Sequence, residues 1–277
     1  MAKRAKATVR NGRDRSGSLQ KIMDLASEAL VGGRYFECER LANQALHQAW
    51  DAGDYDSMAR ITMPLQEARR QRRLNAIDAG HIVLYDEDNP PPGAEAEYKP
   101  GVYIVTPPFV AADARVIAET SFESDAPTFS FACEPRTQLG LTPVVVVGPI
   151  VLRARIKPAR QPDSAWCLGV IDALTEVALD TLDPTRPLPR QVDEVMDRLD
   201  ALPESELLHQ KLVEIAHAAL HEENGVETEP DGASAIDEKP VKSGKAKKRA
   251  KSRRKAARKT GARSSKASAS TVTDESE

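Results

Sequence analysis

The C-terminal segment, residues 223–277, constrains the fold most, because it contains almost no large apolar side chain. After Ile236, only Val241 and Val272 are larger aliphatic residues. A segment of Lys, Arg, Ala, Ser, Gly and Thr cannot bury enough apolar surface to offset the entropy that ordering costs. We therefore expect residues 223–277 to be disordered and the folded part to span about residues 16–220, enough for one domain or two small ones.

The formal net charge of −3 conceals a strong segregation of charge. Residues 1–15 carry six Lys and Arg against one acid, and residues 239–266 carry fourteen Lys and Arg and no acid. Residues 16–238 hold 19 bases and 38 acids, a balance of −19. The sequence therefore predicts an acidic body with two basic tails, of which residues 1–17 form the N-terminal, disordered one.

The composition of the chain argues against several broad classes of protein. The longest apolar stretch, Val144 to Leu152, is too short to span a bilayer. The first residues lead into further charge and show no signal peptide. Three scattered cysteines indicate a reducing compartment and no disulfide framework. We expect a protein without membrane contact in the cytoplasm, with nucleoid association as an alternative.

Residues 18–79 show the three- and four-residue spacing of buried helical faces. A first helix is expected from the N-cap Ser18 to Gly32-Gly33. The second has an apolar stripe of Cys38, Leu41, Ala42, Ala45, Leu46, Ala49 and Trp50. We expect its other side chains to face water, namely Glu37, Glu39, Arg40, Asn43, Gln44 and Gln48. The third begins after Asp54 and runs to about Ala79-Gly80, and Pro64 should kink or restart it near Thr62.

The turns of this module resemble those of a known repeat family. Gly33-Arg-Tyr-Phe-Glu-Cys38, followed by Ala45-Leu46, is similar to the glycine–x–aromatic turn and small-residue helix of tetratricopeptide repeats, and Gly53-Asp-Tyr55 repeats the turn. The turns lie 20 residues apart instead of 34, so the resemblance implies a helical hairpin or three-helix unit and not a full array. In that family, stacked helix pairs bind peptides or proteins, which implies a protein partner here.

Residues 80–160 change to the period of β-structure, and a sheet of four or five strands is expected. A short helix is expected over 111–122. Val144–Val147 should form a strand buried on both faces, and Arg153 and Arg155 should line the wet face of the next. The clearest strand signals lie at 81–85, 101–105, 128–133 and 143–156.

Residues 161–222 return to a helical period, with three apolar stripes separated by a proline-containing linker and a turn. The fold class is therefore predicted as α+β. Its organisation is a helical hairpin module at 18–79, a β-rich region at 80–160 and a helical region at 161–222, between tails at 1–17 and 223–277.

Four arginines of the third helix form the densest basic cluster in the acidic body. Arg69, Arg70 and Arg73 share one helical face, while Arg72 falls nearer the apolar stripe. These three could contact a phosphate or an acidic partner. The alternative, which the sequence favours, is neutralisation of local acids such as Glu67 and Asp78.

Other candidate chemistry has a simpler explanation. The cysteines Cys38, Cys133 and Cys167 lie in apolar patterns and fit small core residues better than zinc ligands. His217 and His221 are four apart on a predicted helix, but no third ligand is indicated. The acidic loop at 86–89 lacks the glycine of an EF-hand. We therefore predict no catalytic, metal or cofactor residue, and a non-catalytic protein is favoured over an enzyme.

The basic run from Lys245 to Lys259 is the strongest functional signal. It resembles the Lys/Ala-rich tails of linker histones and of some HU-like nucleoid proteins. Many cations displace condensed counterions from a polyanion, which gives salt-sensitive binding without sequence preference. The segment could instead solubilise the protein or bind its acidic body. The predicted nucleic-acid contacts are Lys245, Lys247, Lys248, Arg249, Lys251, Arg253, Arg254, Lys255, Arg258 and Lys259.

Three functions remain open at this point. The first is a non-catalytic interaction or scaffold protein that binds a protein through its helical module and nucleic acid or a ribonucleoprotein, non-specifically, through its tail. The second is a dedicated nucleoid-associated DNA-binding protein, which the acidic body makes awkward. The third is an enzyme of unknown reaction, with acids or His81 in a cleft of the β-region.

Overall fold

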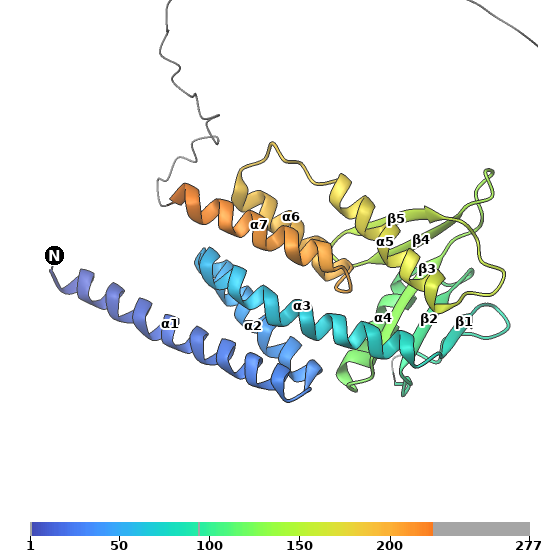
Figure 1. Cartoon of the computed structure of the whole chain (residues 1–277), viewed down its shortest axis with the longest axis horizontal. Coiled ribbons are helices and arrows are strands. Elements are labelled where there is room, and N and C mark those ends of the chain that lie inside the picture. Colours follow the sequence, from blue (N-terminus) through green and yellow to red (C-terminus); the bar gives the residue numbers. More distant parts are fainter. Residues whose placement is uncertain (1, 94, 224–277) are drawn as a thin grey trace, which may run out of the picture. The chain divides into compact units, whose positions relative to one another are not determined.

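The computed structural model describes residues 2–93 and 95–223, with side chains over 17–93 and 95–222. This part of the chain contains both helices and one sheet, which confirms the α+β class (Figure 1). The helices are α1 (Ala2–Val31), α2 (Tyr35–Ala52), α3 (Tyr55–Asp78), α4 (Ala111–Glu123), α5 (Ser164–Asp180), α6 (Leu188–Ala201) and α7 (Glu206–Glu223). The strands are β1 (Ile82–Tyr85), β2 (Gly101–Val105), β3 (Thr128–Cys133), β4 (Thr142–Val147) and β5 (Val151–Ile156).

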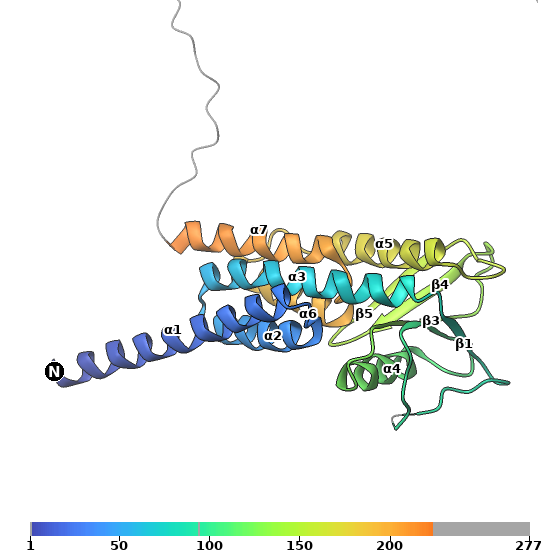
Figure 2. The same ribbon diagram turned by 60° about the horizontal axis from the view of Figure 1, so that its bottom comes forward.

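The helices α1, α2 and α3 pack in sequence, and α7 packs against α3 (Figure 2). The turns between them use Gly33 and Gly53, whose φ angles of 69° and 66° lie in the left-handed region that glycine adopts without strain. Asp54 caps α3 by accepting a hydrogen bond from the Ser57 amide at 3.0 Å, as its position predicts. Fully buried alanines allow the helices to approach closely, namely Ala26, Ala29, Ala42, Ala45 and Ala49.

Two sequence expectations about these helices differ from the structure. The first helix begins at Ala2 and not after Ser18, so it includes residues 2–17, which we expected as a disordered tail. Ala, Lys and Arg, which are frequent there, have high helix propensity and favour this extension. The third helix continues through Pro64 and does not restart near Thr62, which was one of the two outcomes expected of this proline. Ile61 and Leu65 are buried on either side of Pro64, and this packing holds the segment in one helix although a main-chain hydrogen bond is lost.

The sheet has the order β1-β2-β3-β4-β5. The first three strands are parallel, and α4 forms the crossover between β2 and β3. Strand β4 is antiparallel to β3, and β5 is antiparallel to β4. The β2 and β3 bounds agree with the predicted runs, and the region predicted over 143–156 is divided into β4 and β5.

Alternate side chains of the sheet belong to two different cores. Val102, Phe129 and Val144 pack with the helices of the main core, whereas Tyr103 and Val145 pack in a smaller core with α4. Strand β4 is therefore buried on both faces, as predicted. On β5, Arg153 and Arg155 are exposed between buried neighbours, which confirms the wet face.

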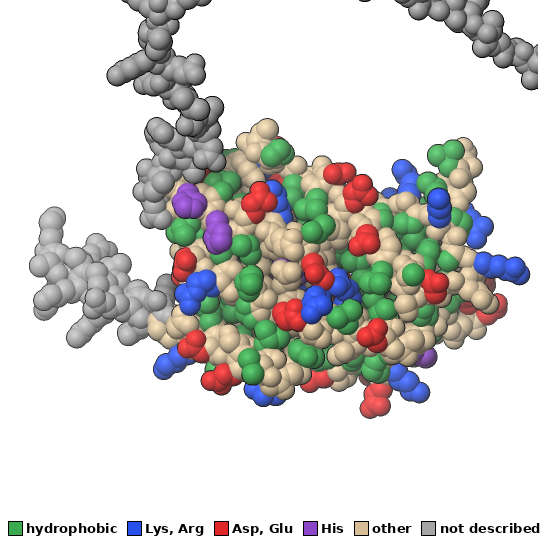
Figure 3. All heavy atoms as spheres, in the orientation of Figure 1, with side chains coloured by type: hydrophobic (Ala, Val, Ile, Leu, Met, Phe, Trp, Pro, Cys, Tyr) green, Lys and Arg blue, Asp and Glu red, His purple; other side chains and the backbone are tan. Residues whose placement is uncertain are grey.

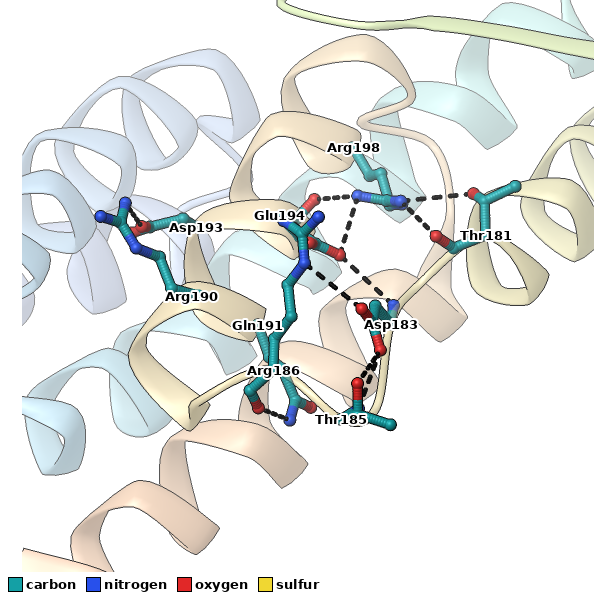
Figure 4. Close-up of polar contacts among 9 residues, drawn as sticks. All are labelled: Thr181, Asp183, Thr185, Arg186, Arg190, Gln191, Asp193, Glu194 and Arg198. Atoms are coloured by element: carbon teal, nitrogen blue, oxygen red, sulfur yellow. Dashed lines mark hydrogen bonds and ion pairs between the residues drawn. The ribbon is translucent and has the colours of Figure 1, made fainter.

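A polar network holds the turn between α5 and α6 (Figure 4). The buried Arg198 side chain donates to the Ala178 carbonyl at 2.9 Å, the Glu194 carbonyl at 2.8 Å and the Thr181 carbonyl at 2.9 Å. Two of these acceptors belong to the C-terminal end of α5, where carbonyls lack partners within the helix. Arg186 and Asp183 extend the network through the Glu194 carboxylate, at 2.5 Å from Arg186 Nη1 and 3.4 Å from the Asp183 amide.

Candidate functional site: the α3 arginine cluster and its cavity

The predicted site residues fall into two groups, one outside the described residues and one on α3. The ten Lys and Arg residues between Lys245 and Lys259 lie outside the described residues. Arg69, Arg70 and Arg73 lie on α3 and form ion pairs within the protein.

The three arginines predicted to share an accessible face are all committed to nearby acids. Arg70, half-exposed, donates to both carboxylate oxygens of Glu67 at 2.8 and 2.9 Å. Arg73 pairs with the Glu206 carboxylate and donates to the Glu204 carbonyl at 2.9 Å. Arg69 is only 7% exposed and pairs with Glu39. These contacts fit charge neutralisation, with Glu67 as one of the acids expected to provide it.

Glu39 is the centre of the cluster, although its place in the sequence predicts a water-facing side chain. It is 3% exposed; Oε1 accepts from Arg69 Nε at 2.9 Å, and Oε2 pairs with Arg72 Nη1. Burial raises its pKa, but the charges and hydrogen bonds of Arg69 and Arg72 outweigh burial and hold the pKa below its usual value. The expectation was wrong for Glu39 alone, because α3 covers this position, whereas Glu37, Arg40, Gln44 and Gln48 are exposed as expected and Asn43 is half-buried.

His209 of α7 joins the cluster from the opposite side. Its Nδ1 lies 2.7 Å from the Ser205 carbonyl, and its Nε2 lies 3.2 Å from Arg69 Nη1. The carbonyl can only accept and Arg69 can only donate, so the ring is neutral, with its proton on Nδ1. Burial, followed by the charge of Arg69, lowers the pKa of His209 to about 3. Both ring nitrogens are therefore occupied and the histidine stays uncharged at neutral pH.

The sequence did carry one signal for His209. Buried residues recur at three- and four-residue spacing along a second face of α7, beginning at Ser205 and continuing through His209, Leu212 and Ala216. A histidine inside such a row, next to the predicted stripe, indicates a helix buried on more than one side. Glu39 offered no comparable signal, because its burial depends on a different helix.

Arg72 differs from the other arginines of the cluster. Its guanidinium carbon lies 4.4 Å from the centre of the Phe36 ring and 4.9 Å from that of Phe122, within cation–π distance. Arg40 lies over the same Phe122 ring at 5.1 Å and donates to the Phe122 carbonyl at 3.1 Å. Arg72 Nε, like Arg73 Nε, is nevertheless buried and has no hydrogen-bond partner.

A cavity of about 320 Å³ lies against this arginine. Residues of α2, α3 and α4 line it together with Thr128 at the start of β3 and residues 199–204 at the end of α6 and in the following turn. A smaller cavity of about 50 Å³ shares four of its lining residues, namely Arg115, Ala118, Pro203 and Glu204. His81, proposed from the sequence for an enzyme site, is not part of either lining.

The cavity wall contains polar groups in contrasting states. Arg115 is satisfied, with Nε at 2.6 Å from Glu119 and Nη1 at 2.7 Å from the Asp200 carbonyl. Thr128 is 6% exposed, and its buried Oγ1 has no hydrogen-bond partner. Burial raises the pKa of Glu204, although the Arg72 and Arg69 charges act against this rise. The wall therefore combines paired arginines with acidic side chains.

The other sequence candidates have no ligand-binding geometry. Cys38 and Cys167 are buried and Cys133 is half-buried, and burial raises their pKa values to about 11, 11 and 12 respectively. His217 and His221 are exposed on α7. In the described part of the chain, no group of three or more His, Cys, Asp or Glu side chains could hold a metal ion.

Comparisons with other proteins add no family. Set against family models, curated proteins and solved structures, this chain has no match in any of the three. None of the described helices combines the length and apolarity needed to cross a lipid bilayer.

Proposed function

We propose that this is a non-catalytic interaction or scaffold protein of the cytoplasm whose basic C-terminal segment binds nucleic acid or a ribonucleoprotein non-specifically. The observation that carries the proposal is the charge segregation, with a balance of −19 over residues 16–238 and fourteen bases without an acid over residues 239–266. A cation-rich segment of this kind gains affinity for any polyanion through counterion release.

The described residues support a model in which the tail, and not the body, binds the polyanion. The face in Figure 3 shows acidic and basic side chains interspersed and not gathered into one basic patch. Many of the arginines are already paired with acids, including Arg69, Arg72 and Arg73. The body therefore contributes little attraction for a polyanion, which favours a tether over a dedicated nucleoid protein.

The protein partner is assigned to the helical module at 18–79, with its tetratricopeptide-like turns. Leu25, Val31 and Met63 of this module are 50%, 91% and 66% exposed. A partner that covers these side chains would remove their apolar surface from water.

Binding of a labelled DNA or RNA duplex, measured by fluorescence anisotropy across a salt series, tests the tether. The slope of log K against log salt should be about −0.9 for each phosphate neutralised, hence steep for a tail with many cations. Deleting residues 239–277 should abolish binding, whereas shuffling the same residues should preserve it, because counterion release has no sequence requirement. Unchanged affinity after the deletion would rule the tether out.

A further inference from the structure

A groove of about 620 Å³ lies between α5 and the first turns of α7. Its lining includes the buried side chains of Ile171 and Thr175 and the half-buried side chain of Leu179. Leu168 on α5 and Leu207 on α7 also line it, and these two leucines are 37% and 52% exposed. A partner in the groove would therefore remove apolar surface of both helices from water.

Three carboxylates follow one another along the exposed side of this groove. Asp172, Glu176 and Asp180 are exposed and recur every four residues on α5, so they lie about one helical turn apart. Among the described side chains, none of these three carboxylates forms an ion pair. The remaining acid of the lining, Glu206, is paired with the base Arg73. The groove therefore keeps a row of negative charges that no ion pair compensates.

The N-terminal half of α1 carries the opposite charge at a matching spacing. Residues 1–15 hold six Lys and Arg and one acid. Small apolar residues recur there every three or four positions, namely Ala2, Ala5, Val9 and Gly12. Three bases recur beside this row at helical spacing, namely Lys6, Arg10 and Arg13. On a helix, the first row of positions forms one face, and the three basic positions follow its edge about one turn apart.

The course of α1 carries this pattern away from its own chain. The helix is continuous from Ala2 to Val31, and its 30 residues span about 45 Å. Leu19, Met23 and Ala26 hold its C-terminal half in the core, whereas Figures 1 and 2 both show the N-terminal half extending beyond α2 and α3. A continuous helix anchored in this way cannot turn back to α5. Because a short helical segment without packing is only marginally stable in water, contact with another molecule would stabilise it.

We propose that the groove between α5 and α7 binds the N-terminal half of α1 from a second copy of this chain. The small residues of α1 pack over Leu168 and Leu207, and its row of bases follows the three carboxylates of α5. Helices with apolar residues at this spacing are common occupants of such grooves. An exchange of both helices between two copies closes a dimer. This contact goes beyond the proposed function, which uses the basic tail and the helical module at 18–79.

Analytical ultracentrifugation of the full chain across a salt series tests the contact. Salt screens exposed ion pairs, so self-association should be measurable at low salt and should weaken as salt is added. Removing residues 2–15 should leave a monomer, whereas removing residues 239–277 should leave the association in place. A parent chain that is monomeric at low salt would overturn the proposal. Association that persists without residues 2–15 but is lost with residues 239–277 would assign it to the tail and overturn the proposal as well.

Reversal of charge identifies the two surfaces. Asp172→Lys combined with Glu176→Lys should weaken self-association at least tenfold, and so should Lys6→Glu combined with Arg10→Glu. The control is Asp24→Lys combined with Glu28→Lys, which reverses two exposed acids at the same spacing on α1 and changes the net charge equally. Its association should stay close to that of the parent. Equal losses in the control and in the groove variant would show that only the net charge matters and would contradict the assignment.

A mixture of the groove variant and the Lys6→Glu, Arg10→Glu variant tests whether the contact joins two copies. In the mixture, the unaltered helix of one variant meets the unaltered groove of the other, and the two reversed surfaces also have opposite charges. The mixture should therefore associate with nearly the affinity of the parent, and much more tightly than either variant alone. A mixture that stays monomeric would contradict the proposal. Because none of these substitutions alters residues 239–277, nucleic-acid binding by the same variants distinguishes a failed groove from a failed tether.

Discussion

Arg198, which is buried, and Arg72, whose side chain is 12% exposed, are two arginines with different surroundings. Both are paired with a glutamate, Glu194 and Glu39 respectively. Around Arg198, every guanidinium nitrogen has an acceptor, and the acceptors are mainly carbonyls of the α5 end (Figure 4). Around Arg72, Nε has none and the side chain lines a cavity.

The difference lies in what surrounds each side chain. Arg198 completes a helix terminus whose carbonyls would otherwise lack partners, so its whole donor set is used by the fold. Arg72 is held by Glu39 and by two phenylalanine rings, which position the guanidinium without using every donor. A fully satisfied network stabilises the fold, whereas a buried donor without a partner costs free energy.

The largest effect is expected from Glu39→Gln, which leaves Arg69 and Arg72 buried without their shared carboxylate. Removing one partner of a buried ion pair typically costs about 3–5 kcal/mol. Urea unfolding of the variant should therefore show a free energy of unfolding lower by about that amount. Glu67→Gln on α3, which changes a half-exposed partner, is the control and should unfold close to the parent. Equal stability of Glu39→Gln and the parent would contradict the central role of Glu39.

A somewhat smaller loss is expected from Arg198→Met, which keeps the aliphatic stem but removes the donors. The carbonyls of Ala178 and Thr181 then lose their charged hydrogen bonds, and such losses amount to about 2–3 kcal/mol. Chemical denaturation measures the change. Unchanged stability of Arg198→Met would contradict a structural role for these hydrogen bonds.

The pH dependence of stability tests the neutral state of His209. In the unfolded chain its pKa is 6.5, and in the folded protein it is lowered to about 3. Between these two pKa values, His209 binds a proton in the unfolded chain but not in the folded protein. The contribution of neutral His209 to the free energy of unfolding is therefore fully present above pH 6.5 and is lost as the pH falls toward 3. Each pH unit in that window costs about 1.4 kcal/mol.

His209→Asn removes this titration while retaining a donor for the Ser205 carbonyl. At pH 8 the parent should be the more stable protein, and urea unfolding from pH 8 to 5 should show the gap narrowing below about pH 6.5. If the free energies of unfolding of the two proteins changed in parallel with pH, His209 would not be the group that binds a proton on unfolding.

The smallest effect is expected from Arg70→Ala, one residue along the helix from the buried Arg69. Arg70 contacts Glu67 in water-accessible surroundings, where an ion pair contributes little. Its urea midpoint should be indistinguishable from that of the parent. A clear shift of the urea midpoint would show that Arg70 contributes to the stability of the fold and does not form only a surface ion pair.

Most of the secondary structure followed from the spacing of apolar residues. The strand runs, the α4 segment and the helices of residues 161–222 were predicted from patterns that arise within each element. The helix at residues 2–17 was missed because charge and composition indicate only that a segment cannot form a core. Whether it continues a neighbouring helix depends on propensities that those features do not weigh.

The candidate site was predicted only in part, because its members come from different elements. The α3 arginine row was identified from the sequence, but Arg72 was set aside as lying nearer the apolar stripe. Glu39 was assigned to the surface, and His209 and Thr128 were not considered. Each becomes significant only once α2, α7 and β3 meet around α3.

The sequence alone therefore determined the segregation of charge, the α+β class and the positions of most elements, because these depend on residue type and on spacing along the chain. Only the tertiary structure decided which charged side chains are buried, which donors remain without partners and where a cavity forms. Burial and hydrogen-bond satisfaction are properties of neighbours in space, and residues 26 to 140 positions away along the chain provide those neighbours for Arg69.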